Sequence, residues 1–392
     1  MQTKRGNPDF FLLFLTLVLV GFGLIMVLSA SSIMALQDYG DMWYFTRRQA
    51  IWIILGLVAL GVLMNIPYVK FQKWFLILTL GNLLLLLLVL IPGIGIQVYG
   101  ARSWLGTGSF RLQPAEFAKL TLILYLAALI SKKGEQIRDF KKGLAPAIVV
   151  TAIFALLIAA QPDFGTAAIV TGIALCVIVC GGANLKHMLF IGTGIVMCMG
   201  AFALSFPHVL RRLNSYLDPW SDPYNTGFHL IQSFYAFGHG GITGVGFGRS
   251  IQKYEYLPHP HNDFIFSIIA EEFGFIGVCF VLFLYTVLIW RILYLCHQMR
   301  ESFCTLVGVG IASMIGIQAF INIGGASGLI PISGVPLPLI SYGGSSMLAT
   351  LMGIGIALSI SREVNRRKIV GKGIRSPQQS LTKSHIHHMK SL

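Results

Sequence analysis

The sequence predicts an all-α, polytopic membrane protein, a bundle of ten transmembrane helices. Hydrophobic residues make up 55% of the 392 positions and charged residues only 11%. A helix of about 20 apolar residues crosses the hydrocarbon core of a bilayer. Apolar runs of about that length follow one another along the chain at 10–33, 46–66, 72–92, 113–131, 143–160, 164–182, 186–206, 264–290, 303–323 and 343–361.

The basic residues indicate how this bundle is oriented. Lys and Arg gather in the cytoplasmic connections of membrane proteins. Here most of them fall in segments that are inside if the N-terminus is inside, so both termini are expected in the cytoplasm. The net charge of +14 does not indicate a nucleic-acid partner, because the basic residues form short blocks between apolar runs. The first run is too long for the apolar core of a signal peptide, so we expect a retained helix.

One connection, 207–263, is much longer than the others and falls outside in this topology. Its length indicates a functional segment or short helices of its own. Its centre, 228–237, is amphipathic enough to lie at the membrane surface. None of the six cysteines lies in this connection, so no extracellular disulfide framework is expected. We expect one membrane domain at 1–365 and a basic, disordered cytoplasmic tail at 366–392.

Four polar features fall at one predicted level, the outer ends of the helices that run from outside to inside. Glu116, Asp163 and Asp263 each mark the first turn of such a helix, and the segment 341–346 opens another. Acids at the edge of a membrane are energetically costly and are functional candidates by default. Their common depth predicts a single site that faces outward.

Each acid also has a structural interpretation. Asp163 and Asp263 suit the cap of a helix, and Glu116 lies within reach of an ion pair with Lys119. For Asp263, residue chemistry alone leaves a general base, a helix cap and an ion-pair partner open. The adjacent acids at 271–272 lie about 12 Å deeper along their helix, and there we expect structural hydrogen bonding.

Arginines occur in three outer connections around these acids. Arg48 ends the first, Arg102 and Arg111 flank the second, and Arg211 and Arg212 open the long one. Arginine at this level often anchors to lipid headgroups. Its planar guanidinium also binds phosphate oxygens through paired hydrogen bonds, and that interpretation predicts a phosphorylated lipid substrate.

Two further patterns lie near Asp263. The glycine-rich segment 238–248 matches a nucleotide-binding motif by spacing only, because no strand–helix unit surrounds it. We expect it to let the backbone approach a ligand or the membrane closely. His259 and His261 lack further ligands at a clear spacing, so no metal site is expected.

Several short motifs occur in order over about residues 8–365. They are Arg48-Gln49, Gly100-Ala101-Arg102-Ser103-Trp104-Leu105, Gln113-Pro114-Ala115-Glu116-Phe117-Ala118-Lys119, Gln161-Pro162-Asp163-Phe164-Gly165-Thr166, Asp218-Pro219-Trp220, Asn262-Asp263-Phe264-Ile265-Phe266 with Glu271-Glu272, and Pro338-Leu339-Ile340-Ser341-Tyr342-Gly343-Gly344-Ser345-Ser346. Together they resemble the SEDS family (shape, elongation, division and sporulation), and its FtsW and SpoVE branch more than RodA.

The resemblance implies a peptidoglycan glycosyltransferase that polymerises lipid II on the outer face of the cytoplasmic membrane. It implies a class B penicillin-binding transpeptidase and other division proteins as partners, and the division septum as the location. It implies no fixed cofactor and leaves a divalent cation open. One departure is His259, because the family often has Glu at this position after Pro258.

The resemblance also assigns roles to residues. It implies that Asp263 is the catalytic residue, that Glu116 and Lys119 pair near it, and that the substrate and its pyrophosphate are bound by Arg48, Arg102, Lys119 and Arg212. The residues expected to support the site are Glu116, Trp104, Asp163, Ser341, Tyr342, Gly343 and Gly344.

The mechanism expected from these roles is an inverting glycosyl transfer. Asp263 removes the proton from the acceptor 4-hydroxyl, which attacks the donor anomeric carbon while undecaprenyl pyrophosphate leaves. One alternative is a lipid II flippase or another transporter, which needs alternating access and a site near the midplane. The other is a non-enzymatic scaffold for a penicillin-binding protein.

Overall fold

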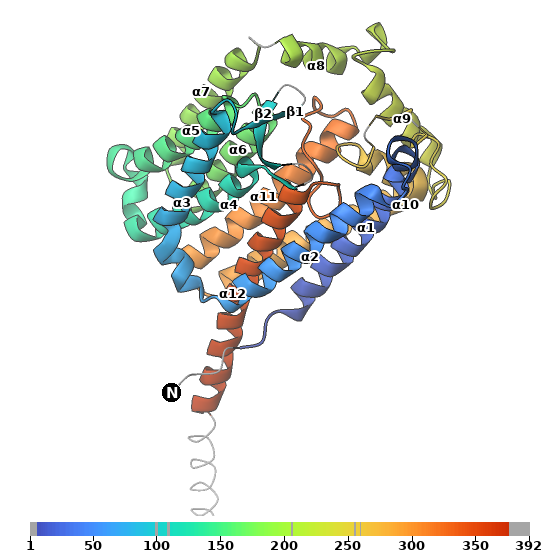
Figure 1. Ribbon diagram of the computed structural model, residues 1–392. Coiled ribbons are helices and arrows are strands. Elements are labelled where there is room, and N and C mark those ends of the chain that lie inside the picture. The colour runs from blue at the N-terminus through green and yellow to red at the C-terminus, as the bar shows by residue number, and fades with distance from the viewer. Residues whose placement is uncertain are drawn as a thin grey trace, which may run out of the picture.

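The apolar runs form helices in the computed structural model, which describes residues 6–98, 101–107, 110–204, 207–254, 256–258 and 260–375. The helices pack side by side as a bundle (Figure 1). Among the described residues, the helices that coincide with the predicted runs are α1 (Phe10–Tyr39), α2 (Tyr44–Asn65), α3 (Tyr68–Leu90), α4 (Pro114–Lys133), α5 (Ala145–Ala159), α6 (Phe164–Cys180), α7 (Leu185–Leu204), α10 (Ile265–His297), α11 (Ser302–Ala326) and α12 (Gly344–Arg375). A 3₁₀ turn (Gly134–Arg138) and a π-helical turn (Phe140–Leu144) join α4 to α5.

Within the described residues, eight helical segments are long and apolar enough to cross a membrane. Helix α6 is apolar as well, but its 17 residues are fewer than the usual crossing length. The expected class, an all-α polytopic membrane protein, is confirmed. The number of ten crossings stays a prediction.

The two described ends of the chain lie at the same end of the bundle (Figure 1). The Asp9 amide donates a hydrogen bond to Ser361 Oγ at 3.1 Å, and Arg362 Nε donates to the Gly6 carbonyl at 2.9 Å. Asp9 also pairs with Arg291 near the end of α10. This arrangement fits an even number of crossings. Helix α12 continues to Arg375, so the boundary expected at 365–366 falls inside a continuous helix.

Helices α4 and α12 form the centre of the bundle. In the most apolar stretch of each, 72% and 83% of the residues are buried, compared with 22% in α3. Helix α3 instead exposes large apolar side chains such as Ile77 and Leu80, which suits contact with lipid. Polar side chains on α4 and α12 are therefore held inside protein.

The connection between α3 and α4 forms a small antiparallel sheet that sequence reasoning did not anticipate. Its strands are β1 (Ile96–Val98), β2 (Ala101–Thr107) and β3 (Phe110–Leu112), in the order β1-β2-β3. The available signal was a pair of short apolar stretches separated by glycines, which is typical of hairpins. Figure 1 places this sheet at the end of the bundle opposite the chain ends.

The long connection contains short helices, as expected. They are α8 (Pro207–Leu217), a 3₁₀ turn (Pro219–Ser221) and α9 (Phe228–Gly240). Ser233 on α9 contacts Ser267 on α10 at 2.6 Å and donates to the Ala326 carbonyl at the end of α11 at 2.6 Å. Helix α9 therefore packs on the start of α10 and the end of α11.

Candidate active site

Lys119 lies buried at the centre of the bundle and contacts two polar partners. Its ammonium is 2.7 Å from Glu116 Oε2, one turn earlier on α4, and 2.7 Å from Gln318 Oε1 on α11. Lys119 is 1% exposed and Glu116 is 3% exposed. The ion pair expected from sequence is therefore present. Because desolvation offsets much of the attraction in such a pair, its presence in the core is weak evidence of added stability.

Two amides on α11 connect this pair to the segment that carries Asp263. Gln318 Nε2 donates to Ser346 Oγ at 2.9 Å and to a carbonyl of the segment 335–336 at 3.1 Å. One turn later, Asn322 Nδ2 donates to the Asp263 carbonyl at 2.9 Å and to the other carbonyl of 335–336 at 2.8 Å. Polar contacts thus run continuously from α4 through α11 to Asp263.

Asp163 joins the outer ends of three helices. It is the N-cap of α6 and accepts a hydrogen bond from the Thr166 amide at 3.0 Å. Its other carboxylate oxygen accepts from Gln113 Nε2 at 2.9 Å, and the Gln113 amide donates to Ser345 Oγ at 3.0 Å. The capping role considered for Asp163 is therefore present, and the same carboxylate links α6 to the starts of α4 and α12.

The segment before α12 is irregular backbone buried among helices. Such backbone needs hydrogen-bond partners from its surroundings. Gln49 on α2, which is fully buried, donates to the Ser341 carbonyl at 3.1 Å and accepts from the Gly343 amide at 3.3 Å. The Tyr342 amide donates to the His261 carbonyl at 2.9 Å. This segment therefore attaches to the residues that precede Asp263.

An aromatic cluster lies between α2 and these two segments. Phe45 packs against His261 and Tyr342, with ring centroids 4.3 Å and 5.3 Å away. The Arg48 guanidinium lies over the Tyr44 ring at 4.2 Å. Burial raises the pKa of Tyr342, and the positive charge of Arg48 opposes that rise. Arg48 therefore acts electrostatically on the segment next to Asp263. It lies in the first turns of α2 and not, as expected from sequence, at the end of the connection before that helix.

The remaining predicted binding residues lie in outer elements. Arg102 and Trp104 are half-buried on β2, opposite Gln97 and Ile96 of β1. Arg212 belongs to α8, but its side chain is not described. His259 lies outside the described residues. Strand β2 and helix α8 lie at the same end of the bundle in Figure 1.

Asp263 stands one residue before the N-cap of α10, which is Phe264. It is partly exposed, and it lines a small pocket together with Phe264, Asn322 and Ser333. The pocket offers about 10 Å³ to the centre of a water molecule, which is room for about one water. The Asp263 carboxylate is therefore accessible at a pocket, which a general base requires.

The glycine-rich segment packs against α10, which was not expected from sequence. Helix α10 breaks at Gly274, which has φ 64° and ψ −163°. The segment 241–246 lies in this break and forms hydrogen bonds that the helix lacks. The amides of Val245 and Gly246 donate to the carbonyls of Glu271 and Glu272, each at 3.0 Å, and the amides of Phe275 and Ile276 donate to the carbonyls of Gly241 and Ile242 at 2.9 and 3.2 Å. The glycines in this segment thus let the backbone approach α10 closely.

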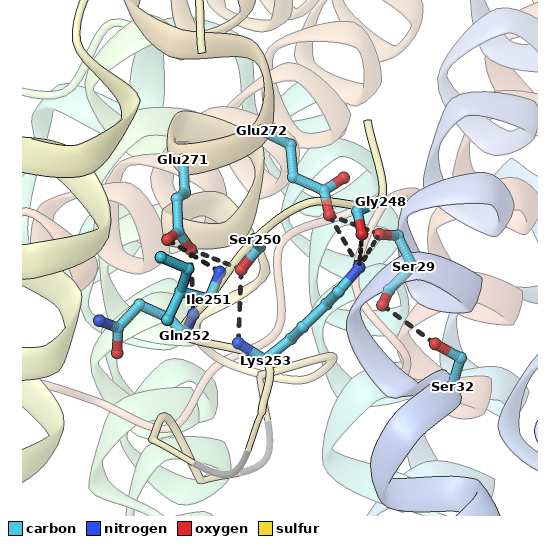
Figure 2. A network of polar contacts seen from close by, with 9 residues as sticks. All are labelled: Ser29, Ser32, Gly248, Ser250, Ile251, Gln252, Lys253, Glu271 and Glu272. Atoms are coloured by element: carbon cyan, nitrogen blue, oxygen red, sulfur yellow. Dashed lines mark hydrogen bonds and ion pairs between the residues drawn. The ribbon is translucent and has the colours of Figure 1, made fainter. Parts of the chain in front are cut away.

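The side chains of Glu271 and Glu272 make structural hydrogen bonds, as expected from sequence. Figure 2 shows Glu271 directed at the backbone of 250–252 and Glu272 directed at Lys253 and Ser29. No group of three or more His, Cys, Asp and Glu side chains that suits a metal occurs within the described parts of the chain.

Sequence reasoning missed the amides Gln318 and Asn322 and gave Gln49 of the Arg48-Gln49 motif no role, although all three connect the segments of the site. The signal was available, because each is a strongly polar residue within an apolar run. In a membrane span such residues face protein or water and find partners there.

The chain matches the family model for FtsW, RodA and SpoVE, described as cell cycle protein, over residues 10–366. It is 43% identical to stage V sporulation protein E of Bacillus subtilis over 362 residues, which are 92% of this chain and 99% of that protein. It is 40% identical to the probable peptidoglycan glycosyltransferase FtsW of Geobacter metallireducens over 353 residues, which are 90% of this chain and 94% of that protein.

Solved structures agree with these relatives. A chain from the structure "Structural coordination of polymerization and crosslinking by a peptidoglycan synthase complex" has a TM-score of 0.74 and 32% identity, covering 91% of this chain and 98% of that one. The rod shape determining protein RodA of Thermus thermophilus has a TM-score of 0.67 and 30% identity, covering 91% and 97%. The chain therefore belongs to the FtsW/RodA/SpoVE family of cell cycle proteins.

Proposed function

We propose that this protein is a peptidoglycan glycosyltransferase that polymerises lipid II into glycan strands on the outer face of the cytoplasmic membrane. The observation that carries the proposal is the family match over residues 10–366, in which relatives are named peptidoglycan glycosyltransferases. The similar chain from a peptidoglycan synthase complex supports the same activity. The connected polar groups around Asp263 supply a site for it.

In the proposed reaction, Asp263 is the general base. It removes the proton from the acceptor 4-hydroxyl, whose oxygen then bonds to the donor anomeric carbon as the bond to undecaprenyl pyrophosphate breaks. A positioned base typically contributes about 10²–10⁴-fold. Inverting hydrolases use a second carboxyl as general acid. Pyrophosphate leaves without such help, so one acid suffices here.

Positive charge near Asp263 favours this reaction, because it stabilises the departing pyrophosphate. Arg48 supports this role through its position over Tyr44 and its effect on Tyr342. The Lys119 ammonium already contacts Glu116 and Gln318, and we propose that it stabilises the site electrostatically. Arg102 and Arg212 are proposed to bind the substrate from the outer elements, supported by Trp104.

The pocket beside Asp263 has room for about one water, so most of a disaccharide on a lipid carrier would lie outside this pocket. We propose that a class B penicillin-binding transpeptidase binds this chain at the septum together with other division proteins. The synthase complex that contains a similar chain supports a partner of this kind.

The test is polymerisation of labelled lipid II by purified protein with its partner. Asp263→Asn is expected to lower the rate at least about 10²-fold, because the amide cannot accept the proton. The matched control is Asp38→Asn. Asp38 is an exposed acid near the C-terminal end of α1, whereas Asp9 caps the N-terminal end. We expect that variant to polymerise like the wild type. If Asp263→Asn also polymerises like the wild type, the base assignment is wrong.

The same preparation decides between the alternatives. Wild-type protein that makes no glycan yet moves lipid II across vesicles is a transporter. Wild-type protein that does neither, while it stimulates crosslinking by the transpeptidase, is a scaffold. Both outcomes overturn the proposed activity.

A further inference from the structure

The residues leading to Asp263 form a loop that is closed at its base by side chains of α10. The Glu271 carboxylate accepts hydrogen bonds from the amides of Ile251 and Gln252 at 3.1 and 3.3 Å and from the Ser250 hydroxyl (Figure 2). Glu271 is fully buried. The Glu271 carboxylate thus fixes the start of the loop. Glu271 itself lies on α10, about two helical turns after Asp263, where the loop ends.

Lys253 closes the same loop with a second set of contacts. Its ammonium donates to the Gly248 carbonyl at 2.7 Å, to Ser29 Oγ at 3.3 Å and to Glu272 Oε1 at 3.3 Å. Ser29 on α1 donates to the same Glu272 oxygen at 2.6 Å. We call Ser29, Lys253 and Glu272 the Lys253 clamp. It joins three parts of the chain: α1, the loop and α10 (Figure 2).

The clamp is poorly optimised for stability. The side chains of Lys253 and Glu272 are 5% and 0% exposed, so both charges are desolvated. The second Glu272 oxygen, Oε2, is buried and has no hydrogen-bond partner among the described residues. Incompletely satisfied buried ion pairs are often less stabilising than apolar residues of the same volume. A contribution to folding alone does not account for this arrangement.

Asp263 lies midway in sequence between Lys253 and Glu272. The loop is held at this point by two hydrogen bonds to backbone, from Asn322 to the Asp263 carbonyl at 2.9 Å and from the Tyr342 amide to the His261 carbonyl at 2.9 Å. These contacts fix where the loop meets α11 and the segment before α12. The clamp fixes the base of the loop against α1 and α10.

We propose that Lys253 and Glu272 are positioning residues that hold the loop so that Asp263 keeps its place at the reacting hydroxyl, and that Ser29 ties this position to α1. The inference rests on the proposed function. Misplacing a catalytic group by about 1 Å costs about 10²-fold in rate. Neither Lys253 nor Glu272 needs to touch substrate for this effect.

Two variants test the clamp. Lys253→Met/Glu272→Leu removes both charges, so no unpaired ion is left buried and the protein is expected to fold. Ser29→Ala keeps the ion pair and removes only the link to α1. In lipid II polymerisation we expect kcat to fall about 10-fold or more for the double variant and about threefold for Ser29→Ala. KM for lipid II is expected to stay within twofold, because the contacts that bind substrate are unchanged.

The matched control is Arg249→Met, which removes an exposed charge from the same loop. It is expected to keep both constants. A double variant that folds with wild-type kcat overturns the proposal. If the double variant does not fold, wild-type kcat in Ser29→Ala overturns it.

A second measurement separates this inference from the proposed function. Amide hydrogen exchange in the segment 254–264 is expected to become at least threefold faster in both clamp variants, with α11 unchanged, whether or not the protein polymerises lipid II. Unchanged exchange overturns the positioning role. If the wild type makes no glycan but exchange is faster in the clamp variants, the proposed enzymatic activity is refuted and the positioning role of the Lys253 clamp stands.

Discussion

Replacing Gly244 with alanine tests whether the glycine-rich segment fills the break in α10. The new Cβ atom would lie 2.2 Å from the Glu272 carbonyl oxygen, and the φ angle of Gly244 is +80°. The left-handed backbone costs about 1–2 kcal/mol for a residue other than glycine. Moving the segment away also deprives that carbonyl of its donor, the Gly246 amide at 3.0 Å, at a cost of about 1–3 kcal/mol. The free energy of unfolding is expected to fall by roughly 2–5 kcal/mol.

Thermal unfolding of the purified protein in detergent measures this loss. At about 1.2 °C per kcal/mol for a chain of 392 residues, Tm of Gly244→Ala should fall by roughly 2–6 °C. Gly238→Ala is the matched control, because Gly238 lies in α9 and an added Cβ meets nothing within 4 Å. Its Tm should stay level or rise, since alanine favours a helix by up to about 1 kcal/mol. Equal Tm values for the two variants would refute the packing argument.

Two further predictions follow from the site. Lys119→Met should lower the free energy of unfolding by about 3–5 kcal/mol, because it leaves the Glu116 carboxylate buried without its cation. Adding Glu116→Leu removes that unpaired charge and should recover most of the lost stability, measured by thermal unfolding. No recovery would contradict the pairing. Arg48→Ala should slow lipid II polymerisation by roughly 10- to 150-fold, because a charge-assisted hydrogen bond contributes about 1.5–3 kcal/mol. Arg47→Ala, which removes an exposed ion pair with Asp41, should change the rate less than twofold, and equal losses would contradict the role of Arg48.

Helix positions were predictable because apolar length is a local property of the chain. Each predicted run coincides with a helix, and Pro114 and Asp163 mark helix starts as their chemistry requires. The β1–β3 sheet was missed, because three short strands between apolar runs carry a weak signal. The tail expected from residue 366 begins within α12, which continues to Arg375, and its boundary stays a prediction. A charged helix beyond a membrane span has no apolar pattern to reveal it.

The candidate site was predictable in its acids and less so in its partners. Glu116 and Lys119 are three residues apart on one helix, so their pairing follows from helical geometry. Gln318 and Asn322 were missed, although polar amides in apolar runs were visible. Their partners are carbonyls and side chains on other segments, and spacing within α11 does not identify them.

The sequence by itself determined the membrane class, the positions of the helices, the acids at their outer ends and, through its motifs, the family. These depend on composition and short-range spacing. Only the tertiary structure decided which buried polar groups meet. Lys119 contacts Gln318 at a separation of 199 residues, and Lys253 contacts Ser29 at 224. The physical reason is that a buried polar group forms hydrogen bonds with whichever groups helix packing brings near it. In the same way, the glycine-rich segment supplies the hydrogen bonds missing at the break in α10, and its local sequence does not specify that it packs there.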